Sequence, residues 1–124
     1  MVVQGRSFPF YEMRAAAEDL RKDAAGNART PDEMAAAFDA ESCRRRLRAQ
    51  FETLKDAKQR HAALSAFGCG AFGNPTEAVA GSYAELLKEY QGDLDVVVFA
   101  IFNPGYGRSD NYEAFEQIFM RANL

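Results

Sequence analysis

The stretch SAFGCGAFGNPTE, Ser65 to Glu77, places a glycine-rich loop between an apolar run and a helical pattern. The run that leads into it, His61 to Phe67, predicts a short buried strand. After the loop, Asn74 can cap a helix that has Pro75 at its first position and Glu77 at the third. This strand–loop–helix unit is typical of α/β folds, and the rest of the chain can be read outward from it.

The predicted helix carries one apolar stripe at helical spacing and stops near Gly92; the stripe comprises Val79, Tyr83, Leu86, Leu87 and Tyr90. The next run, Val96 to Phe102, is apolar throughout and predicts a strand covered on both faces, as in a parallel sheet. A loop over NPGYGRSD follows, and Asp110 with Glu113 forms a capping box for a last helix. The buried stripe of that helix is predicted to be Phe115, Ile118, Phe119 and Ala122.

Upstream, Phe8 to Ala17 partly alternates and predicts a strand, with Pro9 marking an edge or an entry. Gly26-Asn27 signals a turn. Thr30, Pro31 and Glu33 form a capping box with proline at the first helical position. The apolar pattern changes phase near residues 39–42, so one bent helix or two consecutive helices both fit. The predicted strands and helices alternate along the chain, which indicates an α/β fold with right-handed crossover connections.

Length and composition indicate one folded domain that recruits neither nucleic acid nor membrane. The chain has 124 residues, 48% hydrophobic and 27% charged, with a net charge of -3. The arginines at 44–46 and 48 fit a solvated helix face, with phosphate contact as the alternative. Two cysteines and one histidine provide neither a disulfide framework nor a zinc spacing. We therefore expect a cytoplasmic protein without metal or cofactor.

The letters of the loop match G-x-G-x-x-G from Gly68 to Gly73, which allows three interpretations. A dinucleotide fingerprint needs the helix to run through the third glycine and an acid at the end of the next strand. Here Pro75 starts the helix after Gly73, and Asp93 and Asp95 precede the strand. A backbone-amide cradle for phosphate at a helix N-terminus fits better. A tight turn without a ligand remains the alternative.

The same residues resemble a known family. SAFGCGAFGNPTEAVAGSYAELL, followed by VVVFAIFNP, is similar to the C-terminal half of the microbial-type poly(ADP-ribose) glycohydrolase domain, a member of the macrodomain superfamily. Upstream, YEMRAAAEDLR and the arginine-rich helix are similar to the segment before this motif. The resemblance runs from Tyr11 to the end and is most specific from Ala66 to Pro75. It implies a three-layer macrodomain-like fold, with a partial, mostly parallel sheet flanked by helices.

The resemblance also implies a ligand site, in which the loop wraps the diphosphate of ADP-ribose. The phosphates are then held by backbone amides around Gly68, Cys69, Gly70, Ala71 and Gly73. Phe72 packs beside the distal ribose, and Asn103, placed at the end of the last strand, lies near the ribose. The ligand is ADP-ribose or an ADP-ribosylated protein.

The family's catalytic signature, a Gly-Gly-Gly segment followed by Gln-Glu-Glu, is absent, since the chain has no Gly-Gly and no Glu-Glu pair. We therefore expect residues 1–124 to form a single truncated domain that lacks the family's first half and is inactive alone. A hydrolase complemented by a separate N-terminal half, and a non-binding scaffold, are the alternatives. A homodimer or that N-terminal half can pair at the open sheet edge.

No residue of the chain is predicted to be catalytic. The acids near the first strand are interpreted as surface carboxylates, and His61 as a surface residue; these acids are Glu12, Glu18 and Asp19. Cys69 lies near a helix N-terminus, which can lower a thiol pKa. No histidine stands nearby in sequence to form a nucleophile pair, and the family resemblance implies that Cys69 is a loop residue rather than a nucleophile.

Overall fold

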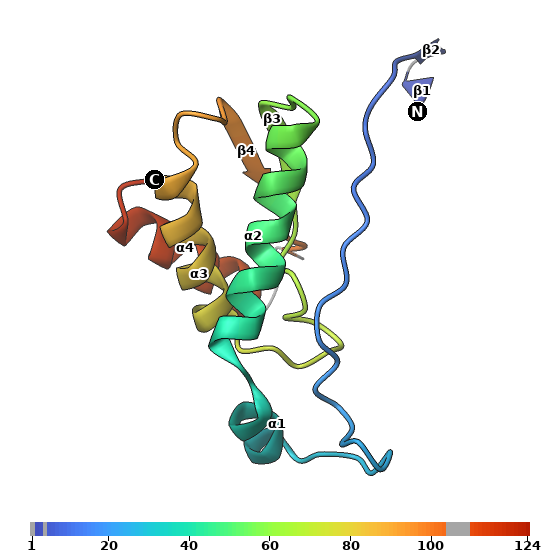
Figure 1. The fold of residues 1–124 in the computed structure, drawn as a ribbon, viewed down its shortest axis with the longest axis vertical. Coiled ribbons are helices and arrows are strands. Elements are labelled where there is room, and N and C mark those ends of the chain that lie inside the picture. Colours follow the sequence, from blue (N-terminus) through green and yellow to red (C-terminus); the bar gives the residue numbers. More distant parts are fainter. Residues whose placement is uncertain (1, 4, 104–109) are drawn as a thin grey trace.

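The computed structural model describes residues 2–3, 5–103 and 110–124, so most of the predicted NPGYGRSD loop lies outside the described residues. The elements, in chain order, are β1 (Val2–Val3), β2 (Arg6–Ser7), α1 (Pro31–Ala37), α2 (Ala40–Asp56), β3 (His61–Leu64), α3 (Thr76–Glu89), β4 (Val96–Phe99) and α4 (Asp110–Arg121). Within the described residues, α2, α3 and α4 lie beside a two-stranded parallel sheet, α1 lies at the far end of α2 from the sheet, and a long extended N-terminal segment runs alongside (Figure 1). The predicted α/β class is confirmed.

Helix α1 begins as its sequence predicts. Thr30 accepts a hydrogen bond from the Glu33 amide, and the Glu33 carboxylate accepts one from the Thr30 amide. Asp39 then caps a separate helix, since its carboxylate accepts from the amides of Glu41 and Ser42. The change of phase at residues 39–42 therefore marks two consecutive helices, because an N-cap residue leaves the helical conformation.

Helix α3 joins the two strands of the parallel sheet as a crossover connection. In that sheet His61 lies opposite Val96, and Leu64 lies opposite Phe99. Figure 1 shows α3 beside α2 and α4. Both strands are shorter than predicted, ending at Leu64 and Phe99.

Only one face of this sheet is covered within the described residues. Leu64 and Phe99 face the core, and Ala62 and Val97 are half-buried against it. On the opposite face Val96 is 49% exposed and Val98 54% exposed. The prediction of a strand covered on both faces is therefore wrong for β4. The apolar run indicates that both faces of the strand are hydrophobic, but within the described residues helices pack against one face only.

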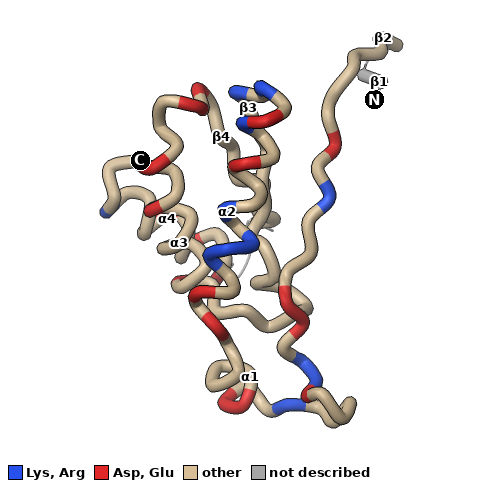
Figure 2. Tube along the Cα trace, viewed as in Figure 1, with Lys and Arg blue, Asp and Glu red and all other residues tan. Residues whose placement is uncertain are grey.

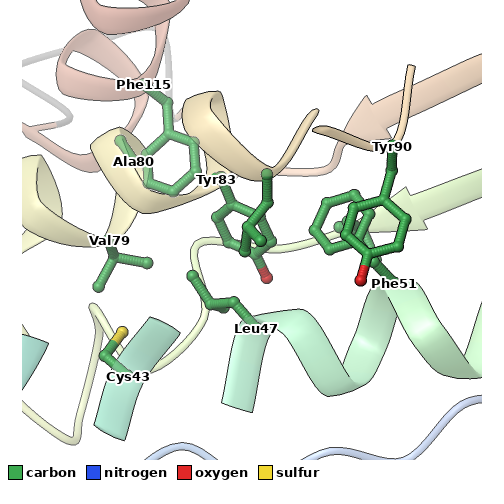
Figure 3. Packing of buried hydrophobic residues seen from close by; sticks show 10 residues of the cluster. Cys43, Leu47, Phe51, Val79, Ala80, Tyr83, Tyr90 and Phe115 are labelled. Atoms are coloured by element: carbon green, nitrogen blue, oxygen red, sulfur yellow. The ribbon is translucent and has the colours of Figure 1, made fainter. Parts of the chain in front are cut away.

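The core is formed where α2, α3 and α4 meet the covered face of the sheet (Figure 3). Tyr83 is 1% exposed and lies at its centre, with its ring edge-on to Phe99 at a centroid distance of 4.9 Å. Its hydroxyl donates to Oε1 of buried Gln50 at 2.9 Å, so the polar groups of both side chains are satisfied. The stripe predicted for α3 is buried, apart from Leu87, which is half-buried.

The strand predicted over Phe8 to Ala17 is absent. The segment is extended, but none of its residues belongs to a strand of the described structure. Phe10 is 58% exposed and Tyr11 77% exposed, so the alternating side chains have no sheet face to cover. Alternation predicts a strand only where a neighbouring strand supplies hydrogen bonds, and here the neighbour is missing. The turn predicted at Gly26-Asn27 is present, with Gly26 at φ +86°.

Charged residues of both signs are distributed along the chain, and Lys and Arg gather in the middle of α2 (Figure 2). Arg44 and Arg48 of α2 pair with Glu89 of α3, and Arg44 also pairs with Glu85. The arginine run thus links two helices, in agreement with a solvated helix face. No helix in the described part of the chain is long and apolar enough to cross a membrane.

Candidate functional site

The loop between β3 and α3 folds back on itself through backbone hydrogen bonds. The amide of Cys69 donates to the Ala66 carbonyl, and the amide of Gly73 donates to the Gly70 carbonyl at 3.2 Å. The Asn74 amide closes the loop by donating to the Gly68 carbonyl at 3.0 Å. These bonds define a compact loop over residues 66–74, which we call the glycine loop.

Two glycines of this loop are required by its backbone conformation. Gly68 has φ +74° and Gly73 has φ +73°, a region that other residues rarely adopt. A Cβ at Gly68 would lie 2.6 Å from the Ala17 Cβ, and one at Gly73 would lie 2.7 Å from the Met34 sulfur. Gly70 differs, since a Cβ there would meet no atom within 4 Å. The backbone conformation thus requires glycine at positions 68 and 73, whereas at Gly70 there is open space where a side chain would lie.

The extended N-terminal segment holds the glycine loop in place. The Leu20 amide donates to the Phe72 carbonyl at 3.0 Å. The side-chain amide of Asn74 donates to the carbonyls of Glu18 at 2.8 Å and of Gly68 at 3.0 Å. Asn74 is buried and therefore joins the loop to a segment far away in sequence. The prediction that Asn74 caps the following helix is wrong, because its side chain makes these contacts instead.

Helix α3 begins without a side-chain cap. Its N-cap residue is Pro75, which has no side-chain donor or acceptor. The amides of the first turn of a helix have no partner within the helix, and the helix dipole adds partial positive charge there. The glycine loop therefore leads into a helix N-terminus whose first amides remain uncapped by a side chain.

The five residues predicted to hold phosphate fall into two groups. The amides of Cys69 and Gly73 already donate within the loop, so in this conformation they shape it. The amides of Gly68, Gly70 and Ala71 have no hydrogen-bond partner among residues 2–3, 5–103 and 110–124. Of these three residues, Gly70 and Ala71 are exposed. The loop thus contains three backbone donors without a partner among the described residues, two of them in exposed residues, and no acidic side chain lies within the loop.

Sequence reasoning missed a positive charge beside the loop. The Arg21 guanidinium carbon lies 5.3 Å from the centre of the Phe72 ring, which is cation–π geometry. Asp19 holds the guanidinium through two hydrogen bonds, of 2.9 and 2.6 Å. These hydrogen bonds with Arg21 lower the pKa of Asp19 to about 2. Nothing in the sequence indicated this contact, because Arg21 and Phe72 are brought together only by the fold.

The thiol of Cys69 is not activated. Burial raises its pKa to about 11, and this effect outweighs the opposing hydrogen bond with Thr76. Burial likewise raises the pKa of the Cys43 thiol. Both cysteines are free thiols. A raised pKa keeps a thiol protonated at neutral pH, which agrees with the interpretation of Cys69 as a loop residue.

The remaining predicted site residue, Asn103, is exposed and lies beyond the end of β4 at Phe99. It is therefore not at the end of the strand as expected. The acids interpreted as surface carboxylates, Glu12, Glu18 and Asp19, are exposed, as is His61. In the part of the chain that the structure describes, no three His, Cys, Asp or Glu side chains are grouped so that they could hold a metal ion.

The fold has counterparts among solved structures. It is similar to poly(ADP-ribose) glycohydrolase from Deinococcus radiodurans in complex with ADP-ribose, with 24% identity and a TM-score of 0.65 over 82% of this chain and 48% of that chain. The apo form of that protein matches with 24% identity and a TM-score of 0.65, over 84% of this chain and 51% of that one. No family model and no curated protein matches the sequence.

The chain spans about half the length of the glycohydrolase structures that it matches. The likeness covers more than four fifths of this chain, at 82% and 84% in the two comparisons. The resemblance drawn from the glycine loop and the strand after it is confirmed at the level of the fold: this chain has the fold of a partial poly(ADP-ribose) glycohydrolase domain.

Proposed function

We propose that this chain binds ADP-ribose, with the diphosphate seated on the glycine loop. The observation that carries the proposal is the set of unpartnered amides of Gly68, Gly70 and Ala71, next to the uncapped start of α3. Backbone donors and a helix N-terminus together form an anion site that needs no basic side chain. Cys69 and Gly73 keep the loop in the conformation that presents these donors.

The ribose next to the diphosphate packs against Phe72, whose ring is half-buried and held from one side by Arg21. Asn103 belongs to the same proposal as a polar group near the ribose. Support for this ligand also comes from the fold, because the similar Deinococcus glycohydrolase is solved in complex with ADP-ribose. The proposed ligand is free ADP-ribose or ADP-ribose attached to a protein.

The proposed activity of the chain on its own is binding without cleavage. The catalytic signature of the family is absent from the sequence, and the glycine loop contains no carboxylate. A second candidate is an ADP-ribosyl hydrolase whose acidic residues come from another polypeptide. The observation that favours it is coverage, because this chain matches about half of a glycohydrolase. The third candidate is a truncated scaffold that binds no ligand.

Calorimetric titration with ADP-ribose tests the binding proposal, and Gly70→Glu is the informative variant. The space around Gly70 admits a side chain, so the loop can keep its shape while a carboxylate occupies the anion site. We expect affinity to fall at least about tenfold, or about 1.4 kcal/mol. Gly92→Glu is the matched control, because a Cβ there also meets no atom within 4 Å and Gly92 lies after α3, at the end opposite the loop.

The outcomes separate the three candidates. Undiminished affinity of Gly70→Glu contradicts the loop assignment, and no heat of binding in the unmodified chain favours the scaffold. Release of ADP-ribose from a modified protein, only after a polypeptide carrying the missing signature is added, favours the complemented hydrolase.

A further inference from the structure

One edge of the parallel sheet carries unpaired backbone groups. The carbonyls of Arg60 and Leu64 accept hydrogen bonds from the amides of Val96 and Ala100, so alternate residues of β3 direct their backbone toward β4. In a parallel ladder the residues between them direct their N–H and C=O groups the opposite way. The amides and carbonyls of His61 and Ala63 therefore point to the outer edge of β3, where the described residues form no further strand.

A cleft of about 650 Å³ runs along this edge of β3. The edge residues His61 and Ala63 line one wall, and Gln50 and Leu54 of α2 also line it. The other wall is the extended N-terminal segment, from Phe10 to Met13 and Ala15. The lining is mostly apolar and includes the exposed rings of Phe10 and Tyr11.

The extended segment is held at its C-terminal part, so the wall it forms is fixed there. Arg46 of α2 donates to the Ala16 carbonyl at 2.9 Å, and Asn74 donates to the Glu18 carbonyl. Between Phe10 and Ala15 no backbone hydrogen bond to another described residue is formed. The cleft is thus bounded by two stretches of extended backbone, both with unused donors and acceptors, which is the geometry that a β-strand between them would satisfy.

We propose that this cleft receives a β-strand from a polypeptide that carries the rest of the glycohydrolase fold. The coverage supports this occupant, since the similar structures contain as much chain again as this one matches. The open sheet face supports it too, because Val96 and Val98 are about half exposed and no layer of the described residues covers them. The strand pairs with His61 and Ala63, and the attached chain covers the open face. The proposal rests on the fold and not on ADP-ribose binding.

A second copy of this chain fits the cleft less well. Its own β3 carries its own extended segment along the same edge, as the cleft lining shows. Two copies can bring their β3 edges together only if both segments leave. A strand without such a flanking segment meets no such obstacle, so the complementing polypeptide is the occupant that the geometry favours.

The test uses the whole 124-residue chain and, as the probe, the part of the Deinococcus glycohydrolase that this chain does not match, co-expressed with an affinity tag and without ADP-ribose. Ala63→Pro removes the outward amide and leaves the β4-facing bonds of β3 intact, since proline is tolerated at sheet edges. Ala63→Val is the control at the same position, because valine favours strands and keeps the amide.

We expect the unmodified chain and Ala63→Val to co-purify with the probe in a one-to-one complex, and Ala63→Pro to bind at least about tenfold more weakly. Thermal melts by circular dichroism check that both variants fold, and hydrogen exchange should show the His61 and Ala63 amides protected only in the complex. Equal binding by Ala63→Pro, a homodimer by light scattering, or no complex at all overturns the proposal. Ligand titration of the free chain is a separate measurement, so failure there leaves this result unaffected.

Discussion

Asn74 and Glu18 are joined by a hydrogen bond of 2.8 Å, from the Asn74 side-chain amide to the Glu18 carbonyl, across 56 positions of sequence. The same amide group also donates to the Gly68 carbonyl. A single buried side chain therefore fixes both the shape of the glycine loop and its attachment to the extended segment. The first prediction concerns this residue.

Asn74→Ala should destabilise the protein by roughly 1–3 kcal/mol, because it leaves the Glu18 carbonyl without its donor in a partly buried site and removes one of the two hydrogen bonds that the Gly68 carbonyl accepts. Urea denaturation followed by circular dichroism measures the change. Gln91→Ala is the control, since it truncates an exposed amide side chain and should stay within about 0.5 kcal/mol of the parent. Equal stability of Asn74→Ala and the parent contradicts the anchoring role.

Gly68→Ala should lower the free energy of unfolding, whereas Gly70→Ala should leave it nearly unchanged. At Gly68 the positive φ disfavours alanine by about 1–2 kcal/mol, and the new Cβ meets Ala17 and Asn74 at 2.6 Å. At Gly70 the backbone and the space both accept a methyl group. We expect an unfolding free energy lower by at least about 2 kcal/mol for Gly68→Ala and little change for Gly70→Ala. A reversed order in urea denaturation would show that the loop adopts another conformation.

Arg21→Ala should weaken ADP-ribose binding modestly, by about two- to fivefold, because exposed cation–π contacts contribute about 0.5–1 kcal/mol. The loss reflects a less restrained Phe72 ring. Arg14→Ala is the matched control, since Arg14 also pairs with a carboxylate two residues away, that of Glu12. Calorimetric titration of both variants with ADP-ribose measures the two affinities. Equal losses of affinity in Arg21→Ala and Arg14→Ala would contradict a role for Arg21 in the site.

Cys69 should react slowly with iodoacetamide at neutral pH, because burial raises its pKa to about 11 and only the thiolate reacts. Its rate should climb about tenfold per pH unit from pH 7 to 10 without levelling off. Peptide mapping by mass spectrometry isolates Cys69 from Cys43, and the unfolded chain in urea is the control. A plateau below pH 8 would instead indicate an activated thiol.

The same pKa shift has a consequence for stability, with a definite sign. The folded-state pKa of Cys69 lies above the ordinary thiol value of 9.0, so the unfolded chain releases this proton first. The contribution of the Cys69 thiol to the free energy of unfolding is therefore fully present below about pH 9 and is lost as the pH rises through about 11. Cys69→Ala should flatten this part of the pH profile in thermal melts.

Local chemistry made much of the fold predictable. The capping box of Thr30 and Glu33 and the strand–loop–helix unit around Gly68 each depend on a few adjacent residues. The change of phase at residues 39–42 left one bent helix and two consecutive helices both open, and the structure has two. The failures involve distant partners. Residues 8–17 alternate like a strand, but no strand in the described part of the chain lies beside them. Asn74 is placed like a helix cap, but its side chain donates to the Glu18 carbonyl.

The candidate site follows the same division. The position of the glycine loop and its free amides could be anticipated from glycine spacing and the following proline. The role of Arg21 could not, because its contact with Phe72 exists only after the N-terminal segment has folded against the loop. The glycines also divide into Gly68 and Gly73, which the backbone conformation requires, and Gly70, beside which there is open space. This division depends on backbone angles and neighbouring atoms that only the folded chain defines.

The hydrogen bond between Tyr83 and Gln50 gives the protein an intrinsic optical reporter. The chain has no tryptophan and five tyrosines, so its near-ultraviolet spectrum comes mainly from phenol rings. Tyr83 is buried in the core, yet its hydroxyl bonds to Gln50, which also lines the cleft beside β3. A chain that enters the cleft changes the surroundings of Gln50 and, through it, the absorption and circular dichroism of that ring. Occupancy of the cleft can thus be followed in the unlabelled protein.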